Sequence, residues 1–426
     1  MPQLRRPAAA QLDAGMSSAR RTPTRRAIVI GGSMSGLFCG LYLRRAGWTV
    51  DIFERSAVAL TGRGAGIMTH AEMHEALAEL GLDTSRGFGV PVERRLALGA
   101  GGEVIAERCC PQTATSWNRL FELLREAFGG NNYHLGKDLH HVEMAEAAVT
   151  AHFSDGSSQS ADLLIGADGF RSTVRAQLLP EAQPQYAGYV AWRGLADERA
   201  AAEALTQELF ESFVFHLPPG EQFLGYPVAG PGNDLRPGHR SWNIVWYRPA
   251  DAATDLPRLL TDETGRTHQL SIAPRLIARD VIADMRADAE RLLPPRLRAL
   301  MRLIRQPFLQ PIYDLQSPRM GVGRVALVGD AACVVRPHVG AGILKAMQDA
   351  ASLTAALDEH NDVEAGIAAY AAQRLPVGAA FIARARRLGI YLRYRFASEE
   401  ERRLAGVHAE PDRVMAETAV LDFLRD

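Results

Sequence analysis

The stretch Gly31-Gly32-Ser33-Met34-Ser35-Gly36 decides the fold of this chain. It follows an apolar run over residues 27–30 and leads into residues 35–46, whose leucines recur at helical spacing, so the sequence predicts a strand, a tight turn and a helix. A second apolar run over residues 48–53 predicts a parallel strand buried on both faces, and Glu54 ends it. These elements form a β-α-β unit with the spacing of a dinucleotide-binding fingerprint.

The turn offers the groups that a dinucleotide needs. Gly31 permits the sharp turn, the free N–H groups of the helix N-terminus suit a pyrophosphate, and the Glu54 carboxylate can accept a hydrogen bond from a ribose hydroxyl. Ser33 stands where a second glycine is usual, so its Cβ narrows the approach of a phosphate while its hydroxyl can donate to one. The predicted cofactor contacts of this unit are Gly31, Ser33, Met34, Ser35, Gly36 and Glu54.

Two more apolar runs end in glycine-acid pairs far along the chain. Residues 162–166 lead into Asp168-Gly169, and residues 324–328 lead into Gly329-Asp330. Each alone is typical of an ordinary strand-ending turn. Residues 336–342, however, place a proline and glycines before a long helical pattern, which leaves that helix N-terminus open to an anionic or electron-rich ring edge. We therefore predict one nucleotide site assembled from three distant segments.

The middle of the chain has a different pattern. Apolar and alternating runs between residues 186 and 248, separated by loops rich in proline and glycine, predict a mainly antiparallel sheet. The fold class is therefore α/β, with a Rossmann-like domain, an inserted antiparallel sheet and C-terminal helices. The predicted divisions are a disordered basic extension (1–23), a discontinuous nucleotide-binding domain (24–80, 112–185 and 305–395), a substrate domain (81–111 and 186–304) and a C-terminal helical segment (396–426).

Composition limits the partners. The 48 basic and 49 acidic residues nearly cancel, which favours a small molecule over nucleic acid or an anionic membrane. No stretch approaches the roughly 20 apolar residues of a membrane span. The four cysteines lack zinc-ligand spacing, so we expect no metal and a reducing, cytoplasmic setting. The arginine-rich residues 1–26 also fit an organellar transit peptide or an over-long start before Met16.

In their order along the chain, the three motifs resemble those of the group A flavin-dependent aromatic hydroxylases, which share the fold of 4-hydroxybenzoate hydroxylase. The resemblance covers residues 24–395. Within this family, the sequence most resembles the 2,6-dihydroxypyridine 3-monooxygenase branch. This narrower resemblance rests on the glycine-serine turn, residues 115–118, 186–194, 226–227 and 336–338, and Lys345. The resemblance implies an FAD-binding domain of the GR2 type and, because dimers are common in the family, makes a homodimer one expectation for the assembly.

The resemblance also implies an activity. Such a protein uses non-covalent FAD, NAD(P)H and O2 to hydroxylate a small hydroxylated aromatic or N-heteroaromatic ring, hydroxypyridine-like in the narrower branch, through a flavin C4a-hydroperoxide. Asp330 would meet the ribityl or pyrophosphate part of FAD, and Asp168 would help to hold FAD and serve transient NAD(P)H binding. The other implied cofactor contacts are Arg55, Arg63, Leu139, Pro337, Gly340, Ala341 and Gly342.

Three positions depart from the family pattern. Trp117, Ala341 and Lys345 stand where most relatives have a flavin-contacting arginine, a glutamine and an asparagine. The source of the flavin-side cation is therefore open, with Arg119 and Arg63 as candidates.

Hydroxylation of a ring requires an electron-rich substrate, so we expect a base or a hydrogen-bond relay that removes a substrate proton. His216 and Tyr226 lie on neighbouring predicted strands of the sheet that covers the flavin in the family, and His70 is a further candidate. His338 beside the flavin-side turn could replace His216. Each also fits an ordinary structural role, and Trp192 is expected either near the flavin or in the sheet core.

Other classes of protein explain the motifs less well. A nicotinamide dehydrogenase would share the first motif but would not need Gly329-Asp330 and the glycine-rich helix entry. Residues 241–246 do not match the paired-tryptophan motif of flavin halogenases. An FAD-dependent oxidase or reductase of the same fold, and a non-enzymatic flavin-binding protein, stay open as alternatives.

Overall fold

The computed structural model describes residues 25–60, 66–85, 87–393 and 396–424. Six strands form the parallel sheet, in the order β16-β17-β10-β1-β2-β6, with only β16 antiparallel to its neighbour. The predicted disordered extension over 1–23 lies outside the described residues. The strands are β1 (Arg26–Ile30), β2 (Thr49–Glu54), β6 (Tyr133–Leu135), β10 (Leu163–Gly166), β16 (Gly321–Val322) and β17 (Val325–Leu327).

A second sheet, here called the large sheet, has nine strands in the order β18-β15-β11-β14-β13-β12-β4-β5-β3. Neighbouring strands are antiparallel except β12 and β4, which are parallel. Its strands are β3 (Gly66–Met68), β4 (Val90–Leu98), β5 (Val104–Ser116), β11 (Gln185–Asp197), β12 (Phe213–His216), β13 (Gln222–Val228), β14 (Ser241–Pro249), β15 (Phe308–Gln316) and β18 (Cys333–Val334). A small three-stranded sheet consists of β7 (Leu139–Met144), β8 (Val149–Phe153) and β9 (Ser158–Ala161).

Helices cover both sheets. The first, α1, begins directly after the glycine turn and packs against β2, α3 and α10, because its leucine and phenylalanine side chains are buried. The helices are α1 (Met34–Arg45), α2 (Ala71–Glu79), α3 (Trp117–Phe128), α4 (Thr173–Leu178), α5 (Glu198–Ala201), α6 (Gln207–Phe210), α7 (Asp255–Leu259), α8 (Arg279–Leu292), α9 (Pro295–Leu303), α10 (Gly342–Glu359), α11 (Val363–Leu388), α12 (Glu399–His408) and α13 (Pro411–Glu417).

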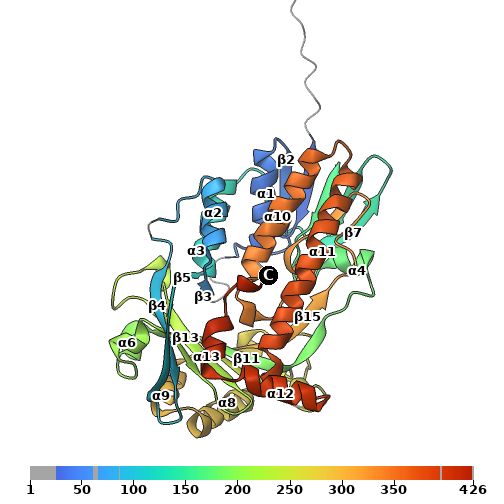
Figure 1. Ribbon diagram of the computed structural model, residues 1–426. Helices are drawn as coiled ribbons and strands as arrows, with labels where there is room; N and C mark the ends of the chain where they lie inside the picture. Colours follow the sequence, from blue (N-terminus) through green and yellow to red (C-terminus); the bar gives the residue numbers. More distant parts are fainter. Residues whose placement is uncertain (1–24, 61–65, 86, 394–395, 425–426) are drawn as a thin grey trace, which may run out of the picture.

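The two sheets occupy different halves of the molecule. Figure 1 shows β2, α1 and α10 in the upper half, and β4, β13, α8 and α9 in the lower half. The predicted α/β fold with an antiparallel second sheet is confirmed. The predicted domain boundaries remain predictions, and β3 and β15, which they assign to the nucleotide-binding domain, pair with strands of the large sheet.

The large sheet has two apolar faces, because successive side chains of a strand point to opposite sides. On the outer face, Trp192, Trp242 and Trp246 pack in one cluster with α8 and α9. On the inner face, Tyr189, Tyr226 and Tyr247 belong to a separate cluster that includes residues of α12 and α13. The inner face also meets the turn before α10, since His338 lies 4.4 Å from Tyr247 between ring centroids.

Candidate active site

Three segments far apart in the sequence meet at the carboxyl ends of the parallel strands. A Cβ at Gly329 would lie 2.2 Å from Ser35 Oγ, and one at Gly31 would lie 2.4 Å from the Ala167 carbonyl oxygen. Both glycines also have positive φ, at 60° and 105°, so a side chain is excluded twice over. The Arg175 guanidinium donates to a backbone carbonyl of the third segment over 3.0 Å. The structure therefore brings the three predicted motifs together.

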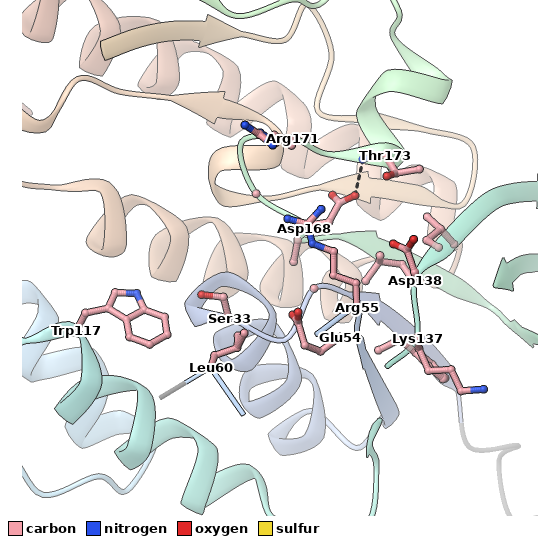
Figure 2. A pocket seen from close by; sticks show the side chains of 16 residues that line it. Ser33, Glu54, Arg55, Leu60, Trp117, Lys137, Asp138, Asp168, Arg171 and Thr173 are labelled. Atoms are coloured by element: carbon pink, nitrogen blue, oxygen red, sulfur yellow. Dashed lines mark hydrogen bonds between the residues drawn. The ribbon is translucent and has the colours of Figure 1, made fainter. Parts of the chain in front are cut away.

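A cavity opens where the first and second segments meet (Figure 2). It has an empty volume of about 750 Å³, its open mouth included. The predicted cofactor residues that line it are Gly31, Ser33, Glu54, Arg55, Leu139 and Asp168.

The cavity lining also contains residues that were not predicted. Lys137 and Asp138 directly precede Leu139, and Arg171 and Thr173 follow Asp168 within the same motif, so sequence adjacency could have identified them. Trp117, one of the departures from the family pattern, also lines the cavity and stacks on Phe121 with ring centroids 4.9 Å apart.

Glu54 holds the shape of the glycine turn. Its carboxylate is buried and accepts from the Gly32 and Ser56 backbone N–H groups, each over 2.9 Å. The Tyr133 hydroxyl donates to the Gly32 carbonyl oxygen over 2.8 Å from the other side. The predicted ribose contact thus uses a carboxylate that is already fixed in place by the backbone. Figure 2 shows Glu54 beside Ser33 and Arg55 in the cavity.

Among the described helices, three lack the groups that usually cap an N-terminus, and two of them, α1 and α10, begin at the predicted cofactor motifs. Neither α1 nor α10 has a side-chain cap or an acidic residue in its first turn. In contrast, Ser116, Asp362 and Ser398 accept hydrogen bonds at the starts of α3, α11 and α12. The uncapped N–H groups and the positive end of the helix dipole suit an anionic ligand.

Asp168 has one satisfied and one unsatisfied oxygen. Its Oδ2 accepts from the Thr173 and Val174 backbone N–H groups over 2.7 and 3.2 Å. Its Oδ1 is buried and has no hydrogen-bond partner among the described residues. Burial raises the pKa of the Asp168 carboxyl. A buried acceptor without a partner is costly, which marks this oxygen as a place for a donor from a ligand.

The third segment surrounds Asp330. The Asp330 side chain is exposed, and desolvation by the surrounding protein raises the pKa of its carboxyl. Lys345, fully buried, donates to the Gly329 carbonyl over 2.9 Å and pairs with Asp349 at 3.3 Å. Lys345 opposes the rise in the pKa of Asp330. Lys345 therefore stabilises the backbone of the Gly329-Asp330 segment.

The turn before α10 leaves room at its end. Gly340 has φ 65°, and a Cβ on it would meet Ala419 at 2.5 Å. Gly342 is exposed, and a Cβ there would meet no atom within 4 Å. Pro337 is half-buried and Ala341 is buried in this turn. The glycine at 342 is therefore not required by the packing of the chain itself.

The remaining predicted cofactor residues lie in different surroundings. The Met34 side chain is buried in the core, so only its backbone can serve a ligand. A Cβ at Gly36 would lie 1.9 Å from the Gly31 carbonyl oxygen, so this glycine serves the packing of the turn. Arg63 lies outside the described residues.

The catalytic candidates separate by face. The Tyr226 ring lies on the inner face, 4.9 Å from Phe213 between ring centroids, and its hydroxyl would lie 3.0 Å from a Cβ on Gly66. His216 pairs with Phe223, a member of the outer cluster, and its Nδ1–H donates to the Leu98 carbonyl over 2.9 Å. His216 and Tyr226 lie on neighbouring strands, as expected, but on opposite faces of the sheet, because their positions in these strands have opposite parity. Their catalytic roles remain predictions.

The same geometry shows where the other candidates lie, and for Trp192 it selects the second of the two expected positions, the sheet core. Trp192 is core of the outer face, opposite Trp246. His70 donates from Nε2 to the Gly340 carbonyl over 3.1 Å, and desolvation lowers its pKa, so it supports the turn as a neutral ring. His338 Nε2 forms a hydrogen bond with the Tyr189 hydroxyl over 2.8 Å. Burial, helped by Arg336 and Arg193, lowers the pKa of His338 to about 3.

Comparison with known proteins shows which family has this sequence and this fold. The chain is 32% identical over 372 residues to 2,6-dihydroxypyridine 3-monooxygenase of Paenarthrobacter nicotinovorans, covering 87% of this chain and 92% of the relative. It belongs to the FAD-dependent aromatic hydroxylases. The structure of 2,6-dihydroxypyridine-3-hydroxylase from Arthrobacter nicotinovorans matches with a TM-score of 0.81 at 30% identity, over 89% of this chain and 96% of that one. An FAD-dependent urate hydroxylase of Klebsiella pneumoniae is 29% identical, over 82% of this chain and 85% of the relative.

Family patterns agree with this membership. The FAD binding domain family matches residues 312–385, and an FAD binding domain-like family matches residues 186–314. The protein is thus an FAD-dependent monooxygenase. The residues present fit FAD: two uncapped helix N-termini suit its pyrophosphate and ring edge, Asp168 Oδ1 lacks a donor, and the space at Gly342 is open.

Two properties of the described residues bear on membranes and metal ions: the length and apolarity of the helices, and the clustering of metal-binding side chains. None of the helices in the described part of the chain is both long and apolar enough to cross a membrane. Among the described residues, no group of three or more histidine, cysteine, aspartate or glutamate side chains is arranged to hold a metal ion.

Proposed function

We propose that this hydroxylase acts on a small hydroxylated aromatic or N-heteroaromatic ring, hydroxypyridine-like in its substitution, with NAD(P)H and O2 as co-substrates. The observation that carries the proposal is the group of polar atoms on the otherwise apolar inner face of the large sheet, where Tyr226, Tyr247 and Asn243 share one face of neighbouring strands. Tyr247 contacts His338 of the turn before α10 there, with ring centroids 4.4 Å apart. A relative 32% identical is named for 2,6-dihydroxypyridine, which supports this substrate class.

FAD, when bound, supplies the redox chemistry: it takes electrons from NAD(P)H and passes an oxygen atom from O2 to the ring. The protein supplies position and polarity. Glu54 and the α1 N-terminus would hold the adenosine and pyrophosphate end, while Asp330, Pro337 and the N-terminal turn of α10 would hold the flavin end.

On the inner face, Tyr226 would orient the ring hydroxyl of the substrate. Its ring is buried and burial raises the pKa of its hydroxyl, so it stays protonated and donates a hydrogen bond at neutral pH. His338, with a pKa of about 3, is neutral and only weakly basic. We therefore place no general base of ordinary strength on this face and expect the substrate to reach its reactive form in another way.

Substrate-stimulated consumption of NAD(P)H tests the proposal. Holoenzyme would be incubated with NADH or NADPH and a panel of hydroxypyridines, phenols and urate, while hydroxylated product and hydrogen peroxide are both measured. A rise in NAD(P)H oxidation matched by product supports hydroxylation. A rise matched only by peroxide would indicate an oxidase or reductase, and no response to any ring would remove the proposed substrate class. Homodimerisation and a cytoplasmic location remain predictions, which sedimentation and fractionation can test.

A further inference from the structure

Arg193 occupies the middle of the inner face. It lies on β11 opposite Val245 of β14, which in turn pairs with Leu224 of β13. Asn243 and Tyr247 flank Val245 on the same side of β14, because residues two apart in a strand share a face. Arg193 is thus next to an apolar floor with polar side chains on either side.

The guanidinium of Arg193 is a cation without a carboxylate partner. No ion pair involves it within the part of the chain that the structure describes, and its buried Nε has no hydrogen-bond acceptor there. The groups that face it are neutral at neutral pH. They are Tyr226 and Tyr247, whose raised pKa values it opposes, and His338, whose lowered pKa it helps to cause.

Two more polar atoms on this face lack partners. Asn243 Nδ2 and Gln222 Oε1 are buried without a hydrogen bond in the described structure. Gln222 pairs with Tyr247 across β13 and β14, so it lies on the inner face as well. A donor cation, a donor amide and an acceptor amide therefore surround the apolar floor at Val245, and unsatisfied buried groups of this kind are rare unless a ligand completes them.

From this juxtaposition we propose that Arg193 binds the ionised oxygen of the substrate, so that the enzyme takes its ring as an anion. The inference rests on the proposed function, and it names the residue and the ionisation state. An arginine presents several N–H donors in a rigid fork, which suits an anionic oxygen better than a neutral hydroxyl. Asn243 and Gln222 would meet a second ring oxygen and a ring N–H.

The consequence is that no strong protein base is needed. A nearby cation favours the charged form of an acid, commonly by about 1 to 3 pKa units at short range. Next to Arg193, a hydroxypyridine or phenol would lose its proton to solvent on binding, and the resulting anion is the electron-rich form that hydroxylation needs. Tyr226, Tyr247 and His338, which face Arg193, add no competing negative charge, because all three are neutral at neutral pH.

The experiment measures the ionisation of a bound ring directly. Oxidised holoenzyme would be titrated without NAD(P)H with 2,6-dihydroxypyridine and with 4-nitrophenol, whose neutral and ionised forms differ in absorption, between pH 5 and pH 10. The variants are Arg193→Gln and Arg193→Lys. Arg302→Gln is the control, because it removes an exposed arginine that is paired with Glu290. FAD content and the far-ultraviolet spectrum verify folding in each protein.

We expect wild-type enzyme to lower the pKa of the bound ring by about 1 unit or more. Arg193→Gln should abolish that shift and weaken binding of the anion about tenfold, with a smaller effect on the neutral ring. Arg193→Lys should keep part of the shift, and Arg302→Gln all of it.

An unshifted ring in the wild type, or a full shift in Arg193→Gln, would overturn the inference while leaving the proposed function intact. If Arg193→Gln does not fold, the pKa of the ring bound to wild-type enzyme and to Arg193→Lys still tests the inference. If no ring of the panel binds wild-type holoenzyme, the proposed substrate class fails and this inference fails with it.

Discussion

The two faces of the large sheet are built from the same strands but differ in how their buried charged groups are paired. On the outer face, Trp246 Nε1 donates to Glu221 over 2.8 Å, and Arg248 joins Glu221 and Asp288 in a closed network. On the inner face, Arg193 Nε and Asn243 Nδ2 lack acceptors in the described structure.

If Arg193 binds the substrate as proposed, this difference separates groups that stabilise the fold from groups that bind a ligand. A closed buried network stabilises the fold only because every charge has its partner. An open one costs free energy in the free protein and is tolerated where a bound molecule completes it. Substitutions on either face therefore test this division.

On the outer face, Trp242→Ala should lower the free energy of unfolding by about 3 to 5 kcal/mol, because a fully buried indole is lost and leaves a cavity. Urea denaturation of the holoenzyme measures the change. The product formed per NAD(P)H should stay the same under conditions where the variant is folded. Trp242→Phe is the matched control and should cost much less, since the indole N–H has no partner to lose in the described structure. Loss of coupling in folded Trp242→Ala would contradict the division.

Facing the inner side, His338 should make stability depend on pH. Its pKa is about 3 in the folded protein, below that of a free histidine, so the unfolded chain binds the extra proton and stability falls as pH drops below about 6.5 toward 3. Between pH 7 and pH 5 this one group should cost about 2 kcal/mol. Comparing urea unfolding of wild type and His338→Gln at both values isolates it, because the other histidines are shared. Equal losses in both proteins would show that His338 is not buried as a neutral ring.

At the N-terminus of α10, Gly342→Val should weaken FAD binding about tenfold or more, which corresponds to about 1.4 kcal/mol, because the side chain would fill the open space there. Fluorescence titration of apoprotein with FAD measures the affinity. Gly406→Val is the control, since Gly406 also lies in a helix and a Cβ on it would meet no atom within 4 Å. Unchanged affinity in Gly342→Val would move the flavin end away from this turn.

Single hydroxyl and imidazole groups on the two faces should have the weakest effects. Tyr226→Phe should lower the product formed per NAD(P)H about fivefold, since one hydrogen bond to the substrate is worth about 1 kcal/mol, and the missing product should appear as hydrogen peroxide. His216→Ala should leave this ratio unchanged and lower only the melting temperature, because its ring bonds to Leu98 on the outer side. If His216→Ala lowered the product formed per NAD(P)H and Tyr226→Phe did not, His216 would be the base and the two faces would not differ in function.

The cofactor half of the molecule could be read from the sequence because its signals are local. The glycine turn, Glu54 and the strand-ending acids are each fixed by a few consecutive residues. Lys137 and Arg171 were missed although they adjoin predicted residues. The face on which His216 lies could not be predicted, because a one-residue difference in strand position reverses the face of a side chain.

The β-α-β unit, the three motifs and the family could be established without a structure, since short-range periodicity and glycine requirements are local properties of the chain. Which polar side chains share a face depends instead on how the strands pair. The alignment of β11, β14 and β13 sets Arg193, Asn243 and Gln222 around Val245, although they are up to 50 residues apart in the chain. Register and burial are non-local, so the unpaired state of these groups becomes visible only once the strands are aligned.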